Sequence, residues 1–141
     1  MNNSLVVQPT NLRILFAVHA TLTFAAGVVL IVAPELIPSA VGIHIELGAY
    51  LICYLLAAAE LSLAVLSWGG RTLSDEKALR VVVLVCIVLH ASSAVLEIYA
   101  FAKGVSAAIW GNIALRAVIV FLFAYYGFYK MRLWKQRLKR M

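Results

Sequence analysis

The segment EKALRVVVLVCIVLHASSAVLEIYAFA, residues 76–102, decides the fold. After Arg80 it stays apolar to its end, interrupted by His90, Glu97 and a few small polar residues. A transmembrane helix needs about 20 mostly apolar residues, because the hydrocarbon core of a bilayer is about 30 Å thick. The segment therefore predicts a membrane-spanning helix that carries two ionisable side chains at membrane depth.

Three further segments of the same kind accompany it along the chain. The four expected spans cover residues 11–33, 47–68, 76–102 and 106–129. Pro34 ends the first span, the Gly69-Gly70 pair ends the second, and Gly104 makes a tight antiparallel turn between the third and fourth. No segment alternates with period two, as the strands of a membrane barrel would. The expected fold is all-α, a single four-transmembrane-helix bundle.

The composition supports a membrane location. Of the 141 residues, 65% are hydrophobic and 13% are charged, whereas soluble domains are about half apolar and about a quarter charged. A soluble domain of this size would leave much of that apolar surface in water, because small domains bury only about two-thirds of it. Cys53 and Cys86 lie in apolar runs near opposite ends of the bundle, so we expect two small apolar thiols and no mutual disulfide.

The distribution of positive charge predicts the orientation. The net charge is +6, and six of the twelve basic residues lie within residues 130–141. The loop at residues 34–46 has no Lys or Arg, whereas the loop at residues 69–80 carries three. The positive-inside rule then places both termini in the cytoplasm. A basic flank of this kind indicates contact with lipid and not with nucleic acid.

The basic tail, residues 130–141, has its own pattern. Met131, Trp134, Leu138 and Met141 follow helical spacing, with basic residues between them. This pattern predicts an amphipathic helix at the interface that contacts anionic lipids. The alternative is a disordered basic flank.

Polar side chains inside the spans form the candidate functional site. Such groups cost several kcal/mol when they face lipid, so they are expected to face the interior and to pair with one another. The candidate ligand-binding or buried polar cluster consists of His19, Glu60, His90, Ser93, Glu97, Asn112 and Arg116.

Helical spacing and the rise of about 1.5 Å per residue assign these residues to layers. His19 and Glu60 fall about 10–12 Å from the inner ends of their helices. His90 and Arg116 fall near the midplane, and Glu97 shares the outer third with Asn112. His90, Ser93 and Glu97 also follow i, i+3, i+7 spacing, so we expect them on one stripe of the third span.

Three interpretations of this cluster stay open. Arg116 with Glu97, or with Glu60, forms an ion pair that fixes the helix register. Alternatively, the cluster holds the polar head of a small ligand, or it carries protons or redox chemistry.

A metal site is not expected, because the chain has no Glu-x-x-His motif and Arg116 would oppose a cation. A bis-histidine haem is not expected either, because His19 and His90 differ by about 7 Å in estimated depth. No catalytic residues are assigned, since the spans contain no hydrolase triad and the chain has no phosphate-binding glycine loop. A quinone or a lipid stays the candidate ligand.

The layout resembles small bacterial four-helix membrane proteins of the broad DoxX-like kind. The resemblance is carried by the end of the first span, from Gly27 to Pro34, by the apolar loop with Pro38 and Gly42, and by Glu60. It covers architecture and no specific motif, and it implies an accessory or small-ligand role in a bacterial plasma membrane.

The sequence thus favours a small non-enzymatic membrane protein. It would be an accessory subunit, or a binder of a hydrophobic ligand such as a lipid or a quinone. The alternatives are a subunit of a membrane enzyme for redox chemistry or proton transfer, and a small transporter or channel formed by a homo-oligomer. Assembly into a homo-oligomer or a larger membrane complex is compatible with each of these.

Overall fold

The computed structural model describes residues 8–138, and this part of the chain is helical with short connections and no β-strand. Four of its helices are long and apolar enough to cross a membrane. They cover Thr10–Val32, Leu47–Gly70, Glu76–Ala102 and Ala107–Leu133. The predicted all-α architecture with four candidate spans is confirmed.

The helical elements follow one another along the four candidate spans. Their bounds are α1 Thr10–Val32, α2 Leu36–Ala40, the short 3-10 turn η1 Leu47–Ala49, α3 Tyr50–Gly70, α4 Glu76–Ala102, the 3-10 turn η2 Ala107–Ile109, α5 Trp110–Ala124, the π-helical turn η3 Tyr125–Lys130 and α6 Met131–Leu138.

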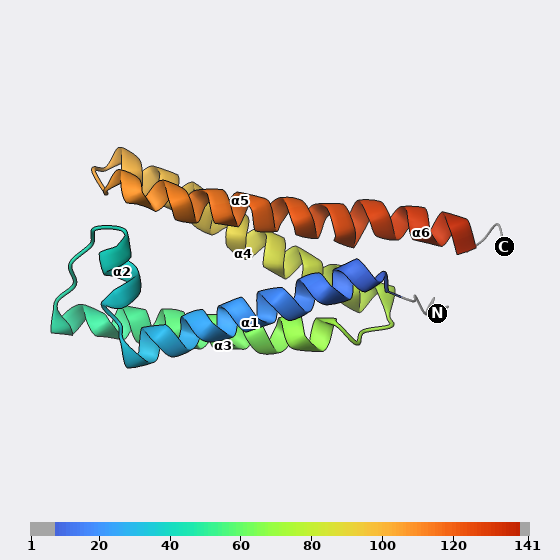
Figure 1. Ribbon diagram of the computed structural model, residues 1–141, viewed down its shortest axis with the longest axis horizontal. Helices are drawn as coiled ribbons and strands as arrows, with labels where there is room; N and C mark the ends of the chain where they lie inside the picture. Colours follow the sequence, from blue (N-terminus) through green and yellow to red (C-terminus); the bar gives the residue numbers. More distant parts are fainter. Residues whose placement is uncertain (1–7, 139–141) are drawn as a thin grey trace.

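The fourth span is longer than expected. The sequence predicted its end at residue 129, but α5 continues through η3 into α6 as one rod (Figure 1). Met131, expected on the lipid-facing side of the tail, is instead buried in the core. Residues 139–141 lie outside the described part of the chain, and the contact of the tail with anionic lipids stays a prediction.

Local chemistry explains where the helices begin and end. α3 ends at Gly70, at the predicted glycine pair. The carboxylate of Asp75 accepts a hydrogen bond of 2.8 Å from the backbone N–H of Ala78, which caps the start of α4. Gly104 has a φ of +103°, a conformation that glycine adopts without steric cost, and it makes the tight turn between α4 and α5.

The spans pair into two hairpins. α1 lies along α3, and α4 lies along α5. Figure 1 shows the two hairpins close together at the end that holds both termini and farther apart at the other end. One buried cluster joins both hairpins near the termini: Leu12, Phe16, Leu63, Leu79, Val82, Val83, Cys86, Phe123 and Met131. The second cluster, Leu30, Cys53 and Ala57, belongs to α1 and α3 alone.

Close backbone approaches hold these contacts. A Cβ atom on Gly27 of α1 would lie 2.9 Å from Cγ of Leu61 and 3.2 Å from the carbonyl oxygen of Ala57, both on α3. The loop after α2 also folds back, because a Cβ on Gly42 would lie 3.1 Å from Cβ of Ser106 at the turn between α4 and α5. The apolar loop of the first hairpin therefore touches the second hairpin at the end where their helices diverge.

Candidate functional site

A continuous series of polar contacts, called the polar network below, crosses both hairpins. It uses side chains from all four spans, in the order Ser67, His19, His90, Arg116, Glu97 and Asn112. Five of the seven side chains predicted for the buried polar cluster belong to it. Ser67 joins it although the sequence analysis did not single it out.

The histidine pair forms the inner half of the polar network. Nε2 of His19 lies 2.8 Å from Nε2 of His90, and Nδ1 of His19 lies 2.8 Å from Oγ of Ser67. The three residues are almost inaccessible, with exposed fractions of 3% for His19, 5% for His90 and 0% for Ser67. The ring of Phe123 packs edge-on against His19, with centroids 5.1 Å apart. The two histidines thus form a polar link inside an otherwise apolar core.

This contact corrects the depth estimate from the sequence. We expected His19 and His90 to differ by about 7 Å in depth, with His19 level with Glu60. Counting residues from helix ends assumes parallel helices, but α4 runs obliquely to α1 (Figure 1). The two rings therefore meet although the residue count placed their residues at different depths. Within residues 8–138, no three His, Cys, Asp or Glu side chains converge as metal ligands.

The outer half of the polar network is the ion pair of Arg116 with Glu97, together with the amide of Asn112. Nε of Arg116 donates to Oε1 of Glu97 at 2.8 Å, and Nδ2 of Asn112 donates to the same oxygen at 2.7 Å. The exposed fractions are 18% for the Arg116 side chain and 16% for the Glu97 side chain. Glu97 and Asn112, expected in the same layer, are in contact, because the turn at Gly104 fixes the register of α4 against α5. The residue count placed Arg116 level with Ser92 or Ser93, but its Nε bonds to Glu97 about one helical turn away.

Two of the predicted residues do not belong to the polar network. Ser93 is half-buried, and no hydrogen bond joins it to the cluster in the described part of the protein. Glu60 is half-buried on α3 and interacts electrostatically with Arg116, but no described basic group lies within 4.0 Å of its carboxylate. Glu60 therefore adds charge near the site without fixing its geometry.

Arg116 determines which atoms donate in the hydrogen bonds of the two histidines. Nη1 of Arg116 lies 3.3 Å from Nδ1 of His90, and a guanidinium can only donate. Nδ1 of His90 therefore accepts, so its Nε2 carries the proton and donates to Nε2 of His19. His19 then carries its proton on Nδ1 and donates to Ser67. The hydroxyl of Ser67 also lies 3.8 Å from Sγ of Cys86, and either group can donate in that contact.

The two histidines are consequently expected in opposite tautomers. Nitrogen-15 NMR of the labelled protein in bilayers should show His90 protonated on Nε2 and His19 protonated on Nδ1. The exposed His44 serves as the reference, since it should average between both forms. Identical tautomers, or a doubly protonated ring at neutral pH, would contradict the assigned direction.

One buried atom of the site has no partner. Oε2 of Glu97 is buried and makes no hydrogen bond within residues 8–138, whereas Oε1 accepts two. A buried acceptor without a donor costs about 1–3 kcal/mol, and more when it is charged. The site therefore presents an acceptor at Glu97 beside the donors of Arg116. This pairing suits a hydroxyl-bearing head group.

Comparison with known proteins does not extend this description. No family model, no curated protein and no solved structure matches the chain.

Proposed function

We propose that this protein is an integral membrane protein, with both termini in the cytoplasm, that binds a hydrophobic molecule through a polar head group. The ligand class is a lipid or a quinone, and the protein acts as a non-enzymatic binder or accessory subunit. The resemblance to DoxX-like proteins points to the same kind of role. A bacterial plasma membrane is the proposed location because the proteins that the chain resembles are bacterial, and the distribution of basic residues supports the orientation of the termini.

The observation that carries this proposal is the unpartnered Oε2 of Glu97 beside Arg116. A carboxylate oxygen needs a donor, which the hydroxyl of a quinol or a glycerol would supply. Arg116 uses Nε for Glu97 and Nη1 for His90, so Nη2 makes no hydrogen bond within the described residues. Nη2 can therefore donate to an oxygen of the same head group.

Proton transfer along the polar network is less well supported by the geometry. The link from Glu97 to His90 passes through Arg116. The guanidinium of arginine does not release its proton in proteins, so it interrupts a proton path. The same contacts suit binding, because a fixed cation and a fixed acceptor orient a head group without any proton moving.

The test is the content of the purified protein. After extraction in mild detergent, mass spectrometry of the native protein should show about one lipid or quinol per chain. Glu97→Gln removes the negative charge and replaces one of the two acceptor oxygens by an NH2 donor, with almost no change in shape. It should lower that content at least about tenfold, since a charged hydrogen bond contributes about 1.5–3 kcal/mol.

A matched control shows whether the effect is local. Glu46→Gln changes the same group at an exposed position before α3 and should retain the ligand. An intact wild-type protein with no stoichiometric small molecule would overturn the proposal. It would leave the ion pair as a device that fixes the helix register.

A further inference from the structure

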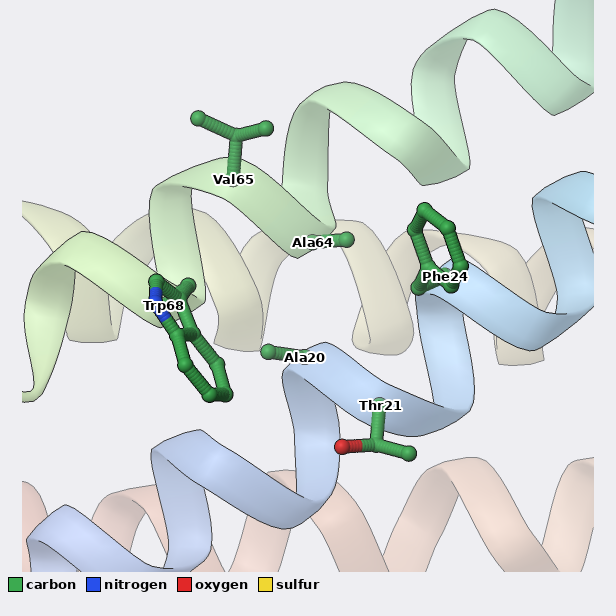
Figure 2. Close-up of a pocket in the computed structure, with 6 residues that line it drawn as sticks. All are labelled: Ala20, Thr21, Phe24, Ala64, Val65 and Trp68. Atoms are coloured by element: carbon green, nitrogen blue, oxygen red, sulfur yellow. The ribbon is translucent and has the colours of Figure 1, made fainter.

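A second candidate site lies outside the polar cluster, on the face of the first hairpin. Six residues line a groove between α1 and α3 with a volume of about 330 Å³: Ala20, Thr21, Phe24, Ala64, Val65 and Trp68. Figure 2 shows Trp68 at one end and Phe24 at the other, with the small side chains of Ala20 and Ala64 between them. The groove is a slot between two aromatic rings, with a floor of small residues.

The lining has no free polar group apart from the indole of Trp68. The hydroxyl of Thr21 donates to the carbonyl oxygen of Ala17 at 3.0 Å, so it is already satisfied by its own helix. Trp68 and Phe24 are more than half exposed, at 55% and 57%. An apolar slot of this kind on a membrane-spanning hairpin fits a hydrocarbon chain.

Positive charge lies at one end of this slot. The guanidinium carbon of Arg71 lies 3.6 Å from the centroid of the Trp68 ring, so a positive charge lies against the ring that forms one end of the groove. On α1, Arg13 precedes Ala17, Ala20 and Phe24 by one, two and three helical turns, so it lies on the groove face of the helix.

Within residues 8–138, neither of these two arginines has a counter-ion. No described carboxylate lies within 4.0 Å of Arg13 or Arg71, whereas Arg80 pairs with Glu76 and Arg116 pairs with Glu97. Arg13 is in the first turn of α1, and Arg71 directly follows the end of α3. Both therefore lie at the same end of the hairpin, at the depth of phospholipid phosphates if the hairpin spans the bilayer.

We propose that the groove between α1 and α3 binds an acyl chain of one anionic phospholipid, whose phosphate lies between Arg13 and Arg71. An apolar partner helix would fill the slot and leave the two arginines without a counter-ion, whereas an anionic phospholipid supplies both an acyl chain and a phosphate. The inference rests on the proposed membrane location and cytoplasmic termini. It does not depend on the ligand of the polar cluster.

Fluorescence quenching by brominated lipids tests it directly. The double variant Trp110→Phe/Trp134→Phe keeps Trp68 as its single tryptophan. It is reconstituted in phosphatidylcholine vesicles that contain equal small fractions of either phosphatidylglycerol or phosphatidylcholine brominated in the acyl chains. We expect the brominated phosphatidylglycerol to quench Trp68 more strongly at each fraction. Each arginine should contribute roughly fivefold to the preference for the anionic lipid.

Charge variants in the same background identify the residues responsible. Arg13→Gln/Arg71→Gln should abolish the preference while quenching by brominated phosphatidylcholine persists, which shows that the variant is still inserted. Arg13→Lys/Arg71→Lys should keep most of it. The control Lys77→Gln/Arg80→Gln removes the same charge from α4, which does not line the groove, and should leave the preference unchanged.

Three results would overturn the proposal, and they are distinguishable. Equal quenching by both lipids in the Trp68 protein would exclude a selective site. Protection of Trp68 from both lipids, with Trp110 quenched in a variant that keeps only that tryptophan, would show that a second copy or another protein covers the groove. Absence of quenching at both tryptophans would mean that the hairpins are not in the bilayer, which would also contradict the proposed function.

Discussion

Replacing Arg116 by glutamine is expected to destabilise the protein by about 3 kcal/mol, because it leaves the carboxylate of Glu97 without its counter-ion in a low-dielectric interior. His90 also loses the donor that fixes its tautomer. Unfolding in mixed micelles of mild detergent and dodecyl sulfate, followed by circular dichroism, measures the change. Arg80→Gln is the control, since its pair with Glu76 is exposed on the arginine side and should contribute less than about 1 kcal/mol.

The double variant Arg116→Gln/Glu97→Gln separates structure from binding. Two amides of similar size can hydrogen-bond to each other, so most of the lost stability should return. If the site binds a head group, the restored protein should still lack the co-purified lipid or quinol. A double variant that regains stability and retains the ligand would refute the binding role of the cluster. A single variant as stable as the wild type would show that the pair is not buried.

The second large effect is expected at Gly127, in the π-helical turn of the fourth span. A Cβ atom there would lie 2.6 Å from Cγ1 and 2.9 Å from Cγ2 of Val83 on α4, and Val83 is fully buried. Gly127→Ala should therefore force α4 and the turn apart and destabilise the protein by about 1–3 kcal/mol. Unfolding in the same mixed micelles measures it.

The contact itself can be tested by compensation. Val83→Ala removes both atoms that clash, so the double variant should be more stable than the sum of the two single effects predicts. Gly111→Ala is the control, because nothing lies within 4 Å of a Cβ at that helical position. It should be neutral or slightly stabilising, since alanine favours helix over glycine by about 1 kcal/mol. Additive effects of Gly127→Ala and Val83→Ala would show that the two residues do not touch.

Much of the fold could be predicted from the sequence, because apolar length and helix-ending residues determine it. The third span runs over residues 76–102, as predicted. The glycine at 104 turns the chain, which explains why the contact of Glu97 with Asn112 could be anticipated. The turn alone did not decide whether Arg116 pairs with Glu97 or with Glu60, and the structure has the pair with Glu97. The end of the fourth span was less predictable, because a π-helical turn continues a helix that the basic residues seemed to end.

Contacts between the two hairpins could not be predicted in the same way. No short turn sets the register of α1 against α4. The contact of His19 with His90 depends on the angle at which these two helices cross, and this angle cannot be deduced from residue numbers. Ser67 could have been found, since it follows Glu60 by seven residues and so lies on the same face of α3. The groove between α1 and α3 could not be predicted, because small and apolar residues of this kind also occur on helix surfaces that face lipid.

The contacts of Arg116 also bear on how such a chain enters a bilayer. Its counter-ion Glu97 and the amide of Asn112 both belong to α4 and α5, the same hairpin. During biogenesis the last two spans can therefore neutralise their buried charges as a self-contained unit, before they meet the first two. The histidine contact forms only when the two units dock. The last step of assembly is then the formation of a polar contact between the two histidines.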